Sequence, residues 1–174
     1  KDVHGQDLEY IIHHLGLDKG QVFLSKQKVN PEHLSVMYNI CDCTISVSDA
    51  EGFGLATLES LSCETPIIAT MTGGLQEQVT DGENWFGVGL EPTSKAIIGS
   101  QEIPFIYEDR LSQEVVVDAL KKIYNMTKEE RAQLGKAGRE HVLKNYSPEK
   151  YAEGWEKLFD RVIEQHGSWD TRKG

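Results

Sequence analysis

The sequence predicts an α/β protein in which a parallel sheet is flanked by helices and followed by a helical C-terminal tail. Two observations support this class. Short, β-branched apolar segments alternate with amphipathic segments as far as residue 111, whereas only helical periodicity continues over residues 112–174. Alternation of this kind is typical of βαβ units, whose parallel strands are joined by right-handed crossovers. We therefore expect one domain, with an α/β part over residues 1–111 and a helical part over residues 112–174.

The α/β part contains four strand-like segments, each preceded or followed by a helical one. Leu8, Ile11 and Leu15 recur at helical spacing, and Pro31 suits the first turn of the next helix, where a missing N–H costs nothing. Four strands are few for a doubly wound sheet, so we expect the chain to be part of a larger fold. The expected strands are 22–24, 44–48, 66–69 and 85–90, and the expected helices are 7–16, 31–41, 55–63 and 75–79.

The helical part carries clear start signals. Thr127 with Glu130 forms a capping-box pattern, and Ser147 before Pro148 is typical of an N-cap followed by a first helical residue. Between the two parts, residues 91–110 show mixed signals over a length that is uncommon for a structureless loop in a compact domain. We expect a small hairpin or a functional flap there.

The composition limits the classes of partner and compartment. The chain has 28 acidic and 18 basic side chains and a net charge of −10, which argues against binding to nucleic acid, because phosphate backbones require clustered Lys and Arg. No apolar run is long enough for a transmembrane segment, and the three cysteines lack the paired spacing of a zinc site. We expect a cytoplasmic protein with reduced cysteines and no metal site.

The segment from residue 49 to residue 60 carries the most chemistry. It follows an expected strand and opens an expected helix, which places it at the sheet edge where open α/β folds bind ligands. Gly52 and Gly54 allow close approach of the backbone, and the amides of the first helical turn can hold a phosphate. Glu51 and Glu59 could accept hydrogen bonds from hydroxyls on either side of that phosphate.

These residues also carry a family resemblance. The string Glu51 to Leu55, followed by Leu58 and Glu59, resembles the E-x7-E signature of retaining glycosyltransferases of family 4, which have the Rossmann-like GT-B fold. Further similarity lies in residues 37–42, in Pro66 to Thr70 followed by Thr72 to Glu77, and in residues 145–155. The resemblance covers about three quarters of the chain and implies the C-terminal half of a GT-B fold with its first strands missing.

The resemblance implies a role for each matching residue. Glu51 would be catalytic and face the transferred sugar, whereas Glu59 would bind the ribose of the donor nucleotide. The amides of Gly52, Phe53, Gly54 and Leu55 would hold the diphosphate. The nucleobase would lie against the loop that ends near Val29, and Gly73 and Gly74 would close the same cleft from the next strand.

The function that follows is transfer of a sugar, with retention, from a nucleotide diphosphate sugar to a hydroxyl acceptor, without a cofactor or metal. The acceptor, a glycan, lipid or small molecule, would bind a missing N-terminal domain, on which activity would depend. One alternative is a non-catalytic nucleotide-sugar binding module or a subunit that needs a separate acceptor-binding chain. A glycosidase is a further alternative, because two carboxylates flank the site, but Glu59 should lie beside the phosphate and not across a sugar ring from Glu51.

Overall fold

The structure is a computed structural model that describes residues 6–171. It divides into two compact units, Lys1–Pro31 and Glu32–Gly174. In the N-terminal unit, α1 (Leu8–His14) begins after Asp7, whose carboxylate accepts a hydrogen bond from the Tyr10 N–H at 3.1 Å. The expectation of one domain with a boundary after residue 111 stays a prediction.

The strand expected at residues 22–24 does not form, so this prediction is wrong. The segment is extended, but within the described residues it pairs with no strand, and the Phe23 side chain is 85% exposed. A short β-branched or aromatic run becomes a strand only when a neighbouring strand accepts its ladder hydrogen bonds, which local sequence does not supply.

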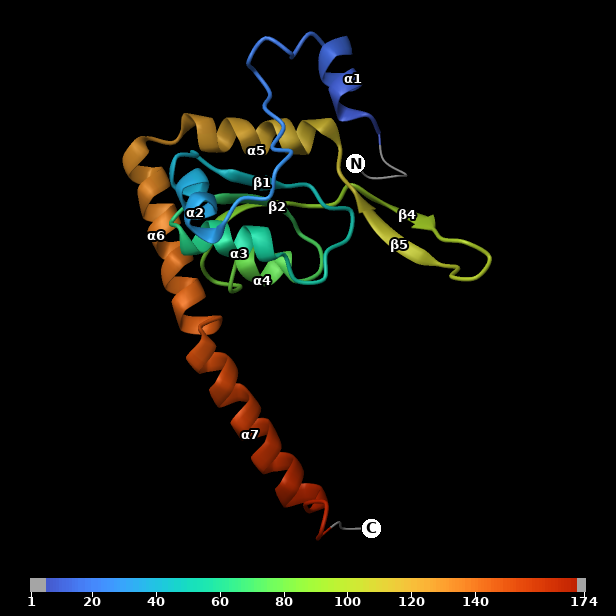
Figure 1. Cartoon of the computed structure of the whole chain (residues 1–174), viewed down its shortest axis with the longest axis vertical. Coiled ribbons are helices and arrows are strands. Elements are labelled where there is room, and N and C mark those ends of the chain that lie inside the picture. The colour runs from blue at the N-terminus through green and yellow to red at the C-terminus, as the bar shows by residue number, and fades with distance from the viewer. Residues whose placement is uncertain (1–5, 172–174) are drawn as a thin grey trace. The chain divides into compact units, whose positions relative to one another are not determined.

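The larger unit is built on a parallel sheet of three strands in the order β1-β2-β3 (Figure 1). The strands are β1 (Thr44–Ser46), β2 (Ile67–Thr70) and β3 (Gly87–Leu90), with Ile68 opposite Ile45 on one side and Val88 on the other. The crossovers contain α3 (Leu55–Ser62) and α4 (Leu75–Val79). The expected α/β class with a parallel sheet is therefore confirmed.

The central strand β2 is buried on both faces. Ile67 and Ala69 pack with α3 and α4 in one apolar cluster, whereas Ile68 packs in a second cluster with residues of α5 (Gln113–Asn125). Alternate side chains of a strand point to opposite faces, so helices must cover both sides of a strand that is apolar throughout. Three layers result, with the sheet in the middle.

The rest of the larger unit, as far as its residues are described, consists of three helices and a hairpin. The first helix of the larger unit is α2 (Pro31–Asn39), and α6 (Lys128–Asn145) is followed by α7 (Pro148–His166), which runs on beyond the end of α6 (Figure 1). The expected capping box is confirmed, since Thr127 and Glu130 exchange hydrogen bonds of 3.1 and 2.7 Å. Residues 91–110 contain the antiparallel strands β4 (Ser94–Ile98) and β5 (Ile106–Arg110), so the expected hairpin is confirmed as well.

Helix α6 packs closely on α3 through a glycine. A Cβ atom added to Gly135 would lie 1.9 Å from the carbonyl oxygen of Glu64, just beyond the end of α3. None of the described helices combines the length with the apolarity that a membrane span requires.

This packing predicts opposite outcomes for one substitution at two helical positions. Gly135→Ala should lower the free energy of unfolding by about 1–3 kcal/mol, because the methyl group forces α6 away from the chain at Glu64. Gly154→Ala in α7 should raise it by about 0.5–1 kcal/mol, since open space surrounds that position and alanine favours a helix. Urea unfolding of both variants measures the difference, and equal effects would contradict the packing.

Candidate functional site

Two loops meet at the carboxyl edge of the sheet. Residues 47–54 connect β1 to α3, and residues 71–74 connect β2 to α4. The Gly74 N–H donates a hydrogen bond to the carbonyl oxygen of Gly52 at 3.2 Å. Because β1 and β2 are parallel neighbours, their following loops emerge at the same edge, which is where open α/β sheets bind ligands.

The contact between these loops leaves no room for side chains at two glycines, and side chains of the following helices leave none at a third. A Cβ atom at Gly73, which has φ of +49°, would lie 1.7 Å from the Glu51 carbonyl oxygen. At Gly74 it would lie 2.8 Å from the Gly52 oxygen, and at Gly54, with φ of +89°, 2.4 Å from a methyl group of Leu75. The surroundings of Gly52 are open, with nothing within 4 Å of its added Cβ. Gly73 and Gly74 thus permit the loops to pack backbone on backbone, and Gly54 permits the first loop to pack on the Leu75 side chain.

A buried glutamine of α4 is hydrogen-bonded to the end of the loop between β1 and α3. The Gln78 amide nitrogen donates hydrogen bonds to the carbonyl oxygens of Phe53 at 2.6 Å and Gly54 at 3.1 Å. Its amide oxygen accepts from the Thr57 hydroxyl at 2.6 Å, and both side chains are almost fully buried. The sequence reasoning missed this pair, although Gln78 occupies the same face of α4 as Leu75 and Val79, and a polar residue on an apolar stripe signals a buried hydrogen bond.

The start of α3 presents backbone amides at this edge. Gly54 is the N-cap and has no side chain that could cap the first turn, and the next residue, Leu55, is 67% exposed. Amides in a first helical turn have no intrahelical partner and carry the positive end of the helix dipole, so they favour an anion. The Phe53 ring meets the Tyr146 ring edge-on at 5.9 Å, which gives this side chain a packing role.

The two glutamates differ in surroundings. Glu51 is half-buried, and its carboxylate lies 3.4 Å from the Phe53 N–H in a weak hydrogen bond. Glu59 is exposed on α3 and accepts a hydrogen bond of 3.0 Å from the hydroxyl of Tyr38, which belongs to α2. Burial and the neighbouring carboxylate together raise the pKa of Tyr38 to about 12. Tyr38 therefore acts as a hydrogen-bond donor that orients Glu59.

The predicted site residues of the larger unit lie on these two loops and on α3. Gly52, Phe53, Gly54, Gly73 and Gly74 are brought together directly by the loop contact, whereas Glu59 extends from the helix that follows. Val29 belongs to the N-terminal unit, so its part in a nucleotide site stays a prediction.

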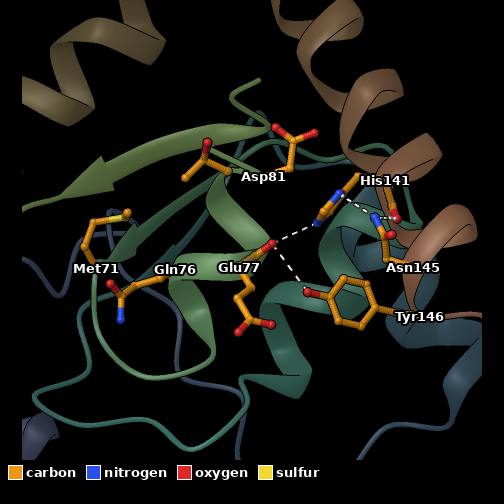
Figure 2. A pocket seen from close by; sticks show the side chains of 8 residues that line it. Met71, Gln76, Glu77, Asp81, His141, Asn145 and Tyr146 are labelled. Atoms are coloured by element: carbon orange, nitrogen blue, oxygen red, sulfur yellow. Dashed lines mark hydrogen bonds between the residues drawn. The ribbon is translucent and has the colours of Figure 1, made fainter. Parts of the chain in front are cut away.

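A separate pocket of about 540 Å³ lies between α4 and α6 (Figure 2). Here a His141 ring nitrogen donates to the Glu77 carbonyl oxygen at 2.8 Å, and the other accepts from the Asn145 amide at 2.9 Å. His141 also stacks on Phe86 with ring centroids 4.1 Å apart. Neither Glu51 nor Glu59 lines this pocket. The hydrogen bond from His141 to the Glu77 backbone joins α6 to α4, so we assign His141 a structural role.

Comparison with protein families matches residues 4–141 to the model described as glycosyl transferases group 1. The D-inositol 3-phosphate glycosyltransferase of Arthrobacter sp. (strain FB24) is 36% identical over 103 residues, which are 59% of this chain and 23% of that protein. The chain thus spans about a quarter of the length of this curated relative.

Two solved structures resemble the fold. The sucrose-phosphate synthase of Thermosynechococcus elongatus has a TM-score of 0.65 and 25% sequence identity, over 90% of this chain and 34% of that one. The C-terminal domain of a group 1 family glycosyl transferase from Francisella tularensis has a TM-score of 0.56 and 25% identity, over 80% of this chain and 60% of that one.

The role of Gln78 predicts a large loss of stability on its replacement. Gln78→Leu should lower the free energy of unfolding by about 1–3 kcal/mol, because it leaves the buried Phe53 carbonyl oxygen without its donor. The Thr57 hydroxyl keeps an acceptor in the Gly54 carbonyl oxygen at 2.8 Å. Gln76→Leu is the matched control, since Gln76 is exposed on the same helix, and should change stability by less than about 0.5 kcal/mol. Equal losses in urea unfolding would contradict the buried clamp.

The raised pKa of Tyr38 predicts a change at alkaline pH. The folded protein keeps this tyrosine neutral up to a pKa of about 12, whereas the unfolded chain ionises near 10. The resulting stabilisation is complete below pH 10 and is lost as the pH rises towards 12. Between pH 9 and 11.5 we expect the free energy of unfolding of Tyr38→Phe to fall by about 1 kcal/mol less than that of the wild type, after allowance for solvent screening. Unfolding measured at pH 9 and 11.5 tests it, and identical pH dependence in both proteins would disprove it.

Proposed function

Since this chain belongs to the glycosyl transferases of group 1, we propose that it is the donor-binding, C-terminal domain of a retaining GT-B glycosyltransferase of family 4. The observation that carries the proposal is the packing of two loops at the sheet edge. The contacts of Gly73 and Gly74 hold the backbone of the loop that carries Glu51 and leads into the first turn of α3. The ligand would be a nucleotide diphosphate sugar.

The first turn of α3 would hold the diphosphate. As the bond between sugar and phosphate breaks, negative charge grows on the leaving diphosphate. The backbone N–H groups of Gly54 and Leu55 can donate hydrogen bonds to it without moving. Gln78 contributes indirectly, because it holds the carbonyls of Phe53 and Gly54 away from the anion. We propose on this basis that the step requires no metal ion.

The two glutamates would bind hydroxyl groups on either side of the diphosphate. Glu51, in the loop, would face the transferred sugar, and Glu59 would accept hydrogen bonds from the ribose. Tyr38 supports the second role, since it holds the Glu59 carboxylate in one orientation before the ligand binds. The open surroundings of Gly52 leave room for the ligand beside the loop.

The acceptor hydroxyl, on a glycan, lipid or small molecule, would be held by a separate N-terminal domain. The curated relative named above is a transferase, which supports a catalytic role over a module that only binds. That relative is named as a D-inositol 3-phosphate glycosyltransferase. The geometry of this chain supports a sugar donor and leaves the acceptor open.

Replacement of Glu59 tests the donor site. Isothermal calorimetry with UDP, GDP and ADP should identify one nucleotide that binds, and Glu59→Gln should weaken it about tenfold, because a hydrogen bond to a charged acceptor is lost. Glu156→Gln, on the exposed surface of α7, is the matched control and should leave affinity unchanged. Wild-type protein that binds none of the nucleotides, or full affinity in the Glu59 variant, would overturn the proposal.

A further inference from the structure

The β4–β5 hairpin is tied to the loop that carries Glu51. The Asp109 N–H, on the outer edge of β5, donates to the Asp49 carbonyl oxygen at 2.8 Å. The Arg110 guanidinium forms an ion pair of 2.8 Å with the Asp49 carboxylate. Asp49 lies two residues before Glu51, so the hairpin holds this loop from one end while Gly73 and Gly74 contact it from the other.

Arg110 is bound in a way that limits its motion. One of its terminal nitrogens contacts Asp49, and the other donates to the Glu108 carboxylate at 2.6 Å. A planar guanidinium that bridges two carboxylates has a defined orientation, which a flexible lysine ammonium does not reproduce. The Arg110 side chain is 37% exposed, so water screens these contacts only in part.

The rest of the hairpin is not needed for the core. Neither apolar cluster of the described residues includes a side chain from β4 or β5, and Ile97 and Phe105 are 62% and 72% exposed. The hairpin leaves the chain between β3 and α5, hence at the same sheet edge as the two glycine loops. Its firm attachment at the base therefore requires a reason other than core packing.

We propose that Arg110 is a positioning residue for the sugar side of the donor site, and that it acts by fixing Asp49 and thereby the backbone that presents Glu51. The inference rests on the proposed function, in which Glu51 faces the transferred sugar. Because the nucleotide is held by α3 and Glu59, loss of Arg110 affects the sugar and leaves the nucleotide in place. The hairpin is then attached to the Glu51 loop by this ion pair together with the hydrogen bond from the Asp109 N–H to the Asp49 carbonyl oxygen.

The affinity of the 174-residue chain for two ligands tests this role. Calorimetry compares the nucleoside diphosphate that binds best with the corresponding nucleotide sugar. Arg110→Gln and Asp49→Asn should each weaken the nucleotide sugar about five- to tenfold and change the nucleoside diphosphate less than about twofold. Arg110→Lys should weaken the nucleotide sugar less than Arg110→Gln does, since lysine keeps the charge but lacks the planar guanidinium that bridges two carboxylates.

Lys95→Gln is the matched control. Lys95 lies on the same hairpin, 3.7 Å from the Asp109 carboxylate, and its ion pair does not involve the Glu51 loop. This variant should bind both ligands as the wild type does. Equal weakening of both ligands by Arg110→Gln, or equal effects of Arg110→Gln and Lys95→Gln, would overturn the role of Arg110.

Amide hydrogen exchange without ligand separates this inference from the proposed function. Arg110→Gln should accelerate exchange at residues 49–51 at least about threefold, whereas Lys95→Gln should not, because only the first removes the ion pair to Asp49. Unchanged exchange would overturn the inference even if nucleotides bind. Accelerated exchange in a protein that binds no nucleotide would instead overturn the proposed function and, with it, the assignment to a sugar.

Discussion

The site depends on a contact in which two loops pack backbone on backbone at the edge of the sheet. A side chain at Gly73 would occupy the position of the Glu51 carbonyl oxygen, and one at Gly74 would meet the backbone of Gly52 and Phe53. Glycine is the residue that allows both the close approach and the positive φ angle at Gly73. The course of the loop that carries Glu51, and the position of the first turn of α3 that follows it, depend on this contact.

Buried hydrogen bonds from α4 stabilise the same contact. Gln78 satisfies two loop carbonyls, and Thr57 satisfies Gln78 in turn, so the polar groups enclosed by the packing remain paired. An unpaired buried polar group costs about 1–3 kcal/mol, which makes the pairing a condition for the packing. The helix N-terminus that would hold a diphosphate is therefore positioned by α4 as well as by its own strand.

Two neighbouring elements stabilise further carboxylates near this edge of the sheet. Tyr38 of α2 orients Glu59 on one side, and Arg110 of β5 holds Asp49 on the other. Both contacts act on a carboxylate and restrict its motion before any ligand is present. For a group 1 glycosyl transferase such preorganisation has a direct use, because groups that are already aligned spend no free energy on reorganisation when charge develops.

The sequence by itself determined the α/β class, the capping box at Thr127 and the strand-loop-helix context of Glu51 and Glu59, because each depends on spacing within a few residues. Only the tertiary structure decided that residues 22–24 form no strand, that Gln78 is a buried clamp and that Arg110 reaches Asp49. These outcomes depend on groups brought together from distant parts of the chain. Periodicity shows which face of a helix or strand is apolar. Which other residues pack against that face depends on the tertiary structure.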